Sequence, residues 1–316
     1  MNIVVTDGYT LNAGDLSWES ISLLGALTVY DRTPAALVEE RCKEADIVVS
    51  NKVRFSSDIL LQLPQLKCIS VSATGFDIID TSDAKKRGIV VCNVPAYGTA
   101  SVSQHVFALL LELTNHVGLN SSSTRQGKWQ QSPDWCYTER PMMELSGKTF
   151  GIIGFGNIGA QTAQIANAFG MKVIYYNPTQ KESDIAEAKN LVPVFKESDV
   201  VSLHCPLKPD NIRFVNTELL QAMKPAAFFI NTARGQLIQE ADLAYALNQE
   251  TIAGAALDAL SSEPPSENNP LLSAKNCIIT PHNAWMSKEA RQRIMDVTKA
   301  NIEAFLNGTP VNVVNK

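Results

Sequence analysis

The sequence predicts an α/β protein built from two doubly wound domains, each with a parallel sheet. Three observations support this prediction. Short apolar segments alternate with helical patterns along the chain, a glycine-rich turn joins two of those segments, and 316 residues exceed the size of one average core.

The first hundred residues repeat a rhythm of strand and helix. Apolar runs predict strands at residues 2–5, 27–30, 46–50, 66–72 and 89–92. Helical patterns lie between most of them, at residues 34–43, 57–63 and 77–87. Pro34 begins the first helix, and Gly88 follows the third, where a helix C-cap falls. This alternation predicts a parallel sheet covered on both faces, in a flavodoxin-like arrangement.

A long apolar helical pattern over residues 101–119 leads into the second domain. The following stretch, 127–143, contains prolines and aromatic residues and is predicted to be an ordered loop that forms an interface or a lid. Further strands are expected at residues 149–153, 172–176, 200–203, 227–231, 252–257 and 276–280. Six strands with intervening helices are typical of the doubly wound dinucleotide-binding (Rossmann) fold. A last helix, 287–306, is left over and is expected to return to the first domain.

The glycine-rich turn carries the most specific local signal. Gly154, Gly156 and Gly159 stand in a G-x-G-x-x-G spacing between a strand and a helix. The first permits the tight turn, the second lets the backbone approach a pyrophosphate, and the third lets helix and strand pack closely. Unpaired N–H groups at the helix start, at Asn157 and Ile158, face the anion. The turn therefore predicts a dinucleotide site; a turn that serves packing alone is the alternative.

Polar side chains follow three strands of the second domain, where ligands of parallel sheets bind. Arg234 follows the strand at 227–231, Glu263 comes after the strand at 252–257, and His282 follows the strand at 276–280. An arginine binds a carboxylate bidentately, a histidine exchanges a proton near neutral pH, and a carboxylate orients the imidazole. This trio predicts carbonyl–alcohol interconversion. Taken singly, Arg234 could form a surface ion pair, Glu263 could shape a turn, and His282 could be a capped loop residue.

Composition excludes several other classes of function. The net charge is −5 with no basic block, which argues against nucleic acid and anionic membranes as partners. No apolar run is long enough to span a membrane, and the N-terminus does not read as a signal peptide. Six scattered cysteines without a C-x-x-C pair predict a cytoplasmic protein with neither a disulfide frame nor a zinc or other metal site.

At this point the chain resembles the D-isomer-specific 2-hydroxyacid dehydrogenases over essentially all 316 residues. The motifs that carry the resemblance are Ser72-Ala73-Thr74-Gly75-Phe76-Asp77, Val94-Pro95-Ala96-Tyr97, Gly151-Ile152-Ile153-Gly154-Phe155-Gly156, His204-Cys205-Pro206-Leu207, Asn231-Thr232-Ala233-Arg234-Gly235, Glu263-Pro264 and Pro281-His282. Two further segments, Asn51-Lys52-Val53 and Asp134-Trp135-Cys136, are most similar to the glycerate dehydrogenase (hydroxypyruvate reductase) branch.

The resemblance implies an NAD(P)-dependent reaction between a small 2-keto acid, with hydroxypyruvate or glyoxylate favoured, and its D-2-hydroxy acid, D-glycerate or glycolate. It implies that Arg234 binds the substrate carboxylate and carbonyl. His282 is then the proton donor during reduction, and Glu263 is its partner.

Other positions follow from the same resemblance. Backbone amides of Ala73, Thr74 and Gly75 are implied to hold the substrate carboxylate from the first domain. Asp258 is implied to orient the nicotinamide carboxamide, and the cofactor site includes His204, Pro206 and Thr232. Trp285 either walls the substrate pocket or fills the core.

The family also implies a discontinuous substrate domain at residues 1–99 and 284–316, and an NAD(P)-binding domain at residues 100–283. Its members commonly form homodimers through the cofactor domain. The apolar helix after Ser101 and the loop with Trp129 and Trp135 suit such an interface. His105 and His116 lie on or at the end of that helix, where packing or interface roles are favoured over catalysis.

One position departs from the pattern of an NAD enzyme. The strand at 172–176 is followed by Asn177 in place of the acidic residue that binds the ribose hydroxyl and repels a 2′-phosphate. Lys181 lies near enough in sequence to meet a phosphate, but no arginine follows. We therefore expect NAD as the cofactor, with relaxed discrimination that also admits NADP.

Two other functions are compatible with parts of the pattern. A short 3-phosphoglycerate dehydrogenase needs extra cations for the phosphate, and the first-domain loops offer only Lys52 and Arg54. A dinucleotide-binding corepressor or scaffold would keep the glycine motif but has no need for Arg234, Glu263 and His282 together.

Overall fold

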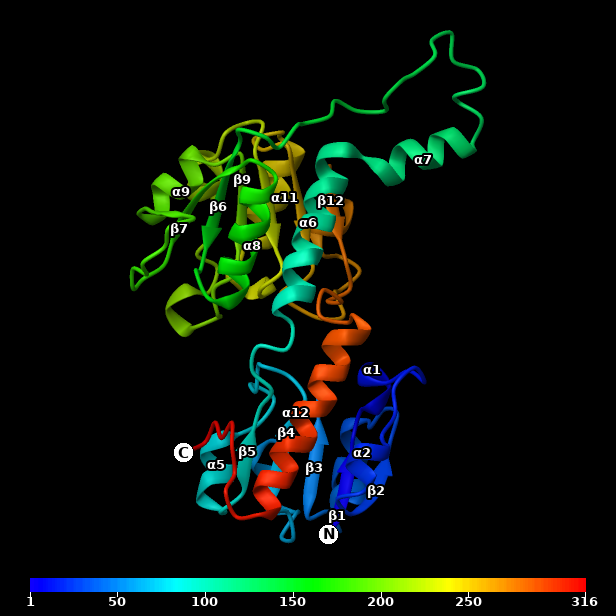
Figure 1. Cartoon of the computed structure of the whole chain (residues 1–316), viewed down its shortest axis with the longest axis vertical. Coiled ribbons are helices and arrows are strands. Elements are labelled where there is room, and N and C mark those ends of the chain that lie inside the picture. Colours follow the sequence, from blue (N-terminus) through cyan, green and yellow to red (C-terminus); the bar gives the residue numbers. More distant parts are fainter. The chain divides into compact units, whose positions relative to one another are not determined.

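The computed structural model describes all of residues 1–316 and divides into two compact units (Figure 1). The N-terminal unit comprises Met1–Tyr97 and Met286–Lys316, and the central unit comprises Gly98–Trp285. We expected the breaks after residues 99 and 283, whereas the structure has them after Tyr97 and Trp285. Each unit contains one parallel sheet, so the predicted α/β class with two parallel-sheet domains is confirmed.

The N-terminal unit is built on a five-stranded parallel sheet of order β2-β1-β3-β4-β5. Its strands are β1 (Asn2–Val5), β2 (Ala26–Val29), β3 (Ile47–Ser50), β4 (Cys68–Val71) and β5 (Val90–Cys92). Its helices are α1 (Gly8–Leu11), α2 (Glu19–Ser22), α3 (Val38–Cys42), α4 (Ser57–Leu61), α5 (Thr81–Lys86) and α12 (Lys288–Leu306). The short helices α1 and α2 were not predicted, because neither is long enough to show a helical period.

Two apolar layers cover the two faces of this sheet. One packs Ile21 of α2 and Ile302 of α12 against Ile3, and the other packs α3, α4 and α5 against Val48 and Ile69. Every residue of β3 and β4 is buried, as expected for parallel strands covered on both sides. Parallel pairing throughout brings the carboxyl ends of all five strands to one edge.

The central unit holds a seven-stranded parallel sheet of order β12-β11-β10-β9-β6-β7-β8. Its strands are β6 (Thr149–Ile153), β7 (Lys172–Tyr176), β8 (Glu187–Ala188), β9 (Val200–Leu203), β10 (Phe228–Asn231), β11 (Gly254–Leu257) and β12 (Cys277–Ile279). Its α-helices are α6 (Thr99–Asn115), α7 (Val117–Arg125), α8 (Asn157–Ala168), α9 (Leu191–Glu197), α10 (Thr217–Ala222) and α11 (Glu240–Asn248). Strand β8 is a seventh strand beyond the six expected, and its two residues are too few to give a sequence pattern.

Helices cover both faces of this sheet as well. On one face α6 and α8 pack through residues such as Val106, Leu110 and Ala163, and on the other face α9, α10 and α11 pack through Phe195 and Leu220. The arrangement leaves the carboxyl edge of the sheet to the loops. The candidate site lies on this edge.

The helix predicted over residues 101–119 is in fact two helices. His116 has φ +50°, in the left-handed region, and it ends α6 and precedes α7. Helix α7 has no buried residue, and with the loop to residue 143 it extends away from the sheet of its own unit (Figure 1). An apolar pattern therefore continued across a break that only the backbone conformation reveals. No helix of the protein combines the length and apolar character needed to cross a membrane.

Candidate active site

The glycine-rich turn connects β6 to α8 at the carboxyl edge of the central sheet. Gly154 has φ +100°, and a Cβ there would lie 2.5 Å from the amide nitrogen of Cys205. A Cβ at Gly159 would lie 2.3 Å from the carbonyl oxygen of Gly154. At Gly156, by contrast, nothing lies within 4 Å of the position of a Cβ. Helix α8 starts at Asn157 without a side-chain cap, so its first N–H groups border open space that fits a pyrophosphate.

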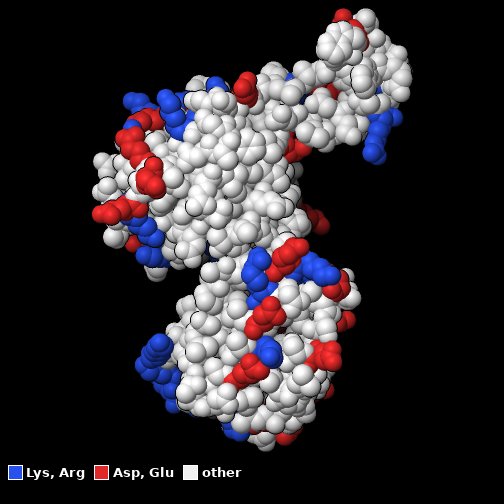
Figure 2. Space-filling view, viewed as in Figure 1, with Lys and Arg blue, Asp and Glu red and all other residues white.

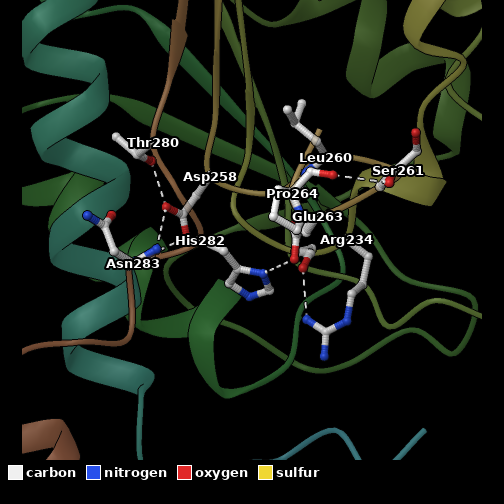
Figure 3. Close-up of polar contacts among 12 residues, drawn as sticks. Arg234, Asp258, Leu260, Ser261, Glu263, Pro264, Thr280, His282 and Asn283 are labelled. Atoms are coloured by element: carbon white, nitrogen blue, oxygen red, sulfur yellow. Dashed lines mark hydrogen bonds and ion pairs between the residues drawn. The ribbon is translucent and has the colours of Figure 1, made fainter. Parts of the chain in front are cut away.

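The three strand-end side chains predicted from the sequence lie together at this edge (Figure 3). His282 Nδ1 is 2.7 Å from Glu263 Oε2, and Glu263 Oε1 accepts a hydrogen bond of 3.1 Å from the amide of Leu260. Because an ionised carboxylate only accepts, His282 carries its hydrogen on Nδ1 when neutral. Its Nε2 then remains for proton exchange with a ligand.

Arg234 reaches the same region from the loop after β10. Its Nη1 donates to the carbonyl of Ala233 at 2.9 Å, and its own carbonyl accepts from Asn231 Nδ2 at 2.9 Å. The loop after β10, which carries Arg234, lies very close to the loop after β11, and this contact positions Arg234. A Cβ at Gly235 would lie 1.9 Å from the carbonyl carbon of Leu260, so only glycine fits at this point.

A buried carboxylate fixes the loop that carries His282. Asp258, 2% exposed, follows β11 and accepts hydrogen bonds from the amides of Asn283 and Ala284, both at 3.0 Å. It also accepts from the hydroxyl of Thr280 at 2.6 Å. His282 itself has φ +52°, an uncommon conformation for a non-glycine residue. The bonds on either side of His282 hold it in that conformation.

Two members of this network were not predicted from the sequence. Thr280 directly follows β12. His105 of α6 has its Nε2 3.1 Å from Thr280 Oγ1 and 3.6 Å from Asp258 Oδ1. Since the hydroxyl donates its one hydrogen to Asp258, it accepts from His105, which therefore carries a hydrogen on Nε2. His105 thus has a polar partner at the site besides its place on a packed helix. The only available signal was a hydroxyl residue two positions before His282.

Similarity to known proteins identifies the family of the chain. Residues 107–284 match the sequence model of the NAD-binding domain of the D-isomer-specific 2-hydroxyacid dehydrogenases. The chain belongs to this family. A hydroxypyruvate reductase from Blautia hydrogenotrophica is 47% identical over the whole of both chains. A glycerate dehydrogenase from Methylorubrum extorquens is 42% identical over 89% of each chain.

Solved structures agree with this assignment. An NADPH-dependent glyoxylate/hydroxypyruvate reductase from Sinorhizobium meliloti superposes with a TM-score of 0.85 at 28% identity, over 99% of this chain and 97% of the other. The protein is therefore an NAD(P)-dependent oxidoreductase that interconverts 2-keto acids and 2-hydroxy acids. The predictions of family, enzyme class and cofactor are confirmed.

In this dehydrogenase Asn177 links the glycine turn to the loop after β7. Its Oδ1 accepts from the amide of Phe155 at 3.1 Å, and its Nδ2 donates to the carbonyl of Thr179 at 2.6 Å. The backbone of Lys181 is bonded through both its amide and its carbonyl to the hydroxyl of Tyr175, while its side chain is exposed. The side chain of Asn177 therefore organises the turn as well as marking the usual ribose position.

His204 and Pro206 follow β9 beside the glycine turn. His204 Nε2 is 3.0 Å from Ser202 Oγ, and burial lowers the pKa of His204 to about 3. Desolvation disfavours the charged imidazolium. His204 is therefore neutral under physiological conditions and adds no charge beside the phosphates of a bound dinucleotide.

Two buried polar atoms at the edge lack any partner. They are Thr232 Oγ1, one residue beyond β10, and Asn283 Oδ1, next to His282. Buried polar atoms are normally hydrogen-bonded, so these two are available to a ligand. Together with the open space at Gly156, they show that this edge fits a dinucleotide.

The remaining predicted residues divide between the two units. Trp285 is half-buried at the end of the central unit. Ala73, Thr74 and Gly75 follow β4 in the N-terminal unit, where the carbonyl of Ala73 accepts from the amide of Val94 at 3.0 Å. The hydroxyl of Thr74 donates to the carbonyl of Val94 at 2.9 Å. These bonds fix the segment and leave its role in substrate binding a prediction.

Proposed function

We propose that the protein reduces hydroxypyruvate or glyoxylate to D-glycerate or glycolate, with His282 as the general acid. The observation that carries this proposal is the 2.7 Å pair between His282 and Glu263 beside Arg234. The relatives described above support the choice of substrates, since hydroxypyruvate reductase and glycerate dehydrogenase are their activities.

The proposed mechanism assigns one task to each side chain. The cofactor, when bound, supplies the hydride. Arg234 binds the substrate carboxylate bidentately, and its fixed charge polarises the neighbouring carbonyl. His282 holds a proton on Nε2 and gives it to the carbonyl oxygen as the alcohol forms. Glu263, bonded to Nδ1, stabilises the imidazolium before transfer and keeps the ring oriented. In the direction of oxidation the same nitrogen takes the proton back.

Asp258 and Thr232 are proposed to bind the cofactor. Asp258 accepts three hydrogen bonds, and a carboxylate has about four lone-pair sites, so one more donor such as a carboxamide N–H can be accommodated. Thr232 Oγ1 is buried and unpartnered. The amides at the start of α8 and the neutral ring of His204 complete the set proposed to surround the pyrophosphate and adenosine.

We further propose that NADH is preferred and that NADPH is also used. Asn177 can bond a ribose hydroxyl but does not repel a 2′-phosphate, and no arginine follows it. Asn177→Asp is expected to lower the kcat/KM for NADPH by about tenfold or more, through charge repulsion, and to leave that for NADH within about twofold. An unchanged ratio would place cofactor selection elsewhere.

The arm formed by α7 and the loop to residue 143 is proposed as the interface of a homodimer. Its exposed apolar side chains include Val117 (63%), Trp129 (52%), Trp135 (87%) and Met142 (56%). Figure 2 shows that most of the arm's surface in this view is uncharged. Sedimentation of Trp135→Ser should reveal a shift towards monomer; a wild-type monomer would contradict the proposal.

Two broader assignments complete the proposal. The N-terminal unit is proposed as the substrate domain, and the central unit as the cofactor domain. All six cysteines are free thiols, which is consistent with a cytoplasmic location.

Absorbance at 340 nm tests the proposed reaction directly. Hydroxypyruvate, glyoxylate and pyruvate are each supplied with NADH and then with NADPH. Rapid oxidation of NADH by hydroxypyruvate is the expected result. No turnover of hydroxypyruvate or glyoxylate with either cofactor would contradict the proposed substrates, while leaving the family assignment intact.

A further inference from the structure

Residues 311–316 run along one edge of the N-terminal sheet, beside β5. Strand β5 is the last in the sheet order, so its outer side has no neighbouring strand from the sheet itself. Val313 forms an antiparallel bridge with Cys92 of β5. We call residues 311–316 the tail. The tail therefore covers an edge strand with an extended chain of the opposite direction.

The outer side of β5 presents backbone groups from alternate residues. The amide of Val90 donates to the carbonyl that precedes β4, at Lys67, at a distance of 2.9 Å. Because successive residues of a strand direct their backbone groups to opposite sides, those of Ile89, Val91 and Asn93 face outward. An edge with unpaired groups is a template for pairing with another chain, so folded proteins cover or interrupt such edges.

Backbone bonds of the tail satisfy part of this edge. The amide of Val314 donates to the carbonyl of Val91 at 2.9 Å. The amide of Asn93 donates to the carbonyl of Asn312 at 3.1 Å. The carbonyl of Asn93 accepts from Nδ2 of Asn301, a buried residue of α12, at 2.9 Å. Asn301 Oδ1 accepts from Asn312 Nδ2 at 2.8 Å, so helix, strand and tail are joined at one point.

The side chain of Asn315 completes the edge. Its Oδ1 accepts from the amide of Val91 at 3.0 Å, and its Nδ2 donates to the carbonyl of Ile89 at 2.8 Å. A carboxamide offers the same donor and acceptor as a peptide group, so Asn315 pairs with β5 as a further strand residue would. The tail therefore matches this edge through side chains as well as backbone, which an arbitrary extended peptide would not do.

Few apolar contacts hold the tail in place. Val314 is half-buried and packs against the apolar layer of α3, α4 and α5, whereas residues 306–312 are all exposed. Helix α12 ends at Leu306, and Gly308 follows with φ +73°, in the left-handed region. A segment with exposed hydrogen bonds and little apolar burial opens at a low free-energy cost. The tail can therefore leave β5 while the rest of the unit stays folded.

We propose that the tail is an exchangeable edge strand: the outer side of β5 is a strand-binding surface, and its partner is the tail of a second copy of this chain. Every copy carries the segment that matches the edge, so exchange replaces each bond with an identical one. Reciprocal exchange closes a pair of copies. In the intact chain the short connection gives the tail an effective concentration of roughly millimolar, which favours closure within one copy.

Shortening the connection tests the proposal. Deletion of Gly308, Thr309 and Pro310 joins Asn307 directly to Val311 and leaves no residues for the turn between α12 and the tail. The tail can then reach only a second copy. The deletion is made in Trp135→Ser, so that the interface proposed for the arm does not contribute. Sedimentation should show about twice the mass of Trp135→Ser alone.

Two matched variants connect this association with the tail. Thr309→Gly with Pro310→Gly, in place of the deletion, keeps the length of the connection and should keep the parent mass. Val314→Pro with Asn315→Ala, added to the deletion, removes one backbone donor and the carboxamide that pair with β5. These two substitutions should return the shortened chain to the parent mass. Circular dichroism checks that each variant is folded.

Hydrogen exchange gives a second readout. The amide of Val91, which is bonded to Asn315, should be protected from exchange in the shortened pair. It should exchange about tenfold faster or more once Asn315→Ala removes its acceptor.

Three outcomes overturn the proposal. The shortened chain keeps the mass of Trp135→Ser, the variant of equal length associates as strongly as the shortened chain, or association survives the substitutions at Val314 and Asn315. The last result would place the contact between copies elsewhere. Because the readout is mass and not turnover, the result does not depend on which keto acid the protein reduces.

Discussion

Two buried aspartates occupy matching places in the two sheets of the protein. Asp7 follows β1 and accepts hydrogen bonds from the backbone amides of Asn51 and Lys52, in the loop after the neighbouring strand β3. Asp258 follows β11 and accepts from two amides in the loop after its neighbour β12. In both sheets a carboxylate at one strand end fixes the loop of the next.

The side chains on the two loops differ, and this difference separates their uses. The loop held by Asp258 carries His282, which is already paired with Glu263, and Thr280 and His105 extend the network. The loop held by Asp7 carries cations with no acidic partner. A paired, hydrogen-bonded group is pre-organised for proton transfer, whereas unpaired cations await a ligand. The same backbone device therefore fixes a loop with a paired histidine in one sheet and a loop with unpaired cations in the other.

The largest expected effect comes from His282. His282→Gln should lower kcat by a factor of about 10²–10⁴, because the positioned proton donor is lost. Affinity for NADH, measured by fluorescence titration, should remain within a few-fold of wild type. A variant that keeps more than a tenth of the wild-type kcat would show that another group donates the proton.

Removing each aspartate compares the two loops directly. Asp258→Ala leaves two amides and the Thr280 hydroxyl without an acceptor. Asp7→Ala leaves two amides without an acceptor, whereas the Thr6 hydroxyl, which also donates to Asp7, keeps the carbonyl of Val49 as a second acceptor. At about 1–3 kcal/mol for each buried group left unpaired, both variants should lose several kcal/mol of unfolding free energy, and Asp258→Ala should lose more. Denaturant titration measures these losses.

The same two variants also show whether each loop matters for activity as well as for stability. At a temperature where both variants stay folded, kcat should fall sharply in Asp258→Ala and change little in Asp7→Ala. Equal losses of kcat would mean that the two loops are not functionally distinct.

A smaller change addresses the hydroxyl that links Asp258 to His105. Thr280→Val keeps the shape of the side chain and removes its hydrogen bonds, at a cost of about 1.5 kcal/mol in unfolding free energy. We expect kcat to fall several-fold with KM unchanged, since the loop of His282 is loosened. Thr280→Ser restores the hydroxyl and should recover most of the rate; if it does not, packing of the methyl group explains the effect.

The smallest expected effect is a pH dependence of stability that is confined to the central unit. All four histidines lie in the central unit, and the pKa of His204 is lowered to about 3 in the folded state. Below the unfolded pKa of about 6.5 the unfolded chain binds a proton that the folded protein excludes, so stability falls as pH falls. From pH 7 to 5.5 the loss should be on the order of 1 kcal/mol.

Hydrogen exchange resolved by unit measures this effect. Protection in the central unit should decrease over that range, after correction for intrinsic exchange, and His204→Gln should abolish the difference. A loss of protection that persists in the variant, or that appears equally in the N-terminal unit, would contradict the assignment to His204.

The sequence by itself determined those features that depend only on residues close together along the chain. The glycine turn requires a strand, three glycines and a helix in succession, and the sequence shows all of them in order. Parallel strands end at a common edge, so the positions of Arg234, Glu263 and His282 after three strands were enough to predict that they lie together. The strands were found because burial on both faces leaves continuous apolar runs.

Only the tertiary structure decided which polar groups meet across long stretches of chain. His105 and Thr280 are 175 positions apart, and Asp7 and Asn51 are 44 positions apart, so no periodicity relates them. The break at His116 was equally hidden, because it depends on a backbone angle within an unbroken apolar pattern. Packing of helices and sheets sets these contacts. They determine which carboxylate holds the loop with the paired histidine His282 and which holds the loop with the cations Lys52 and Arg54.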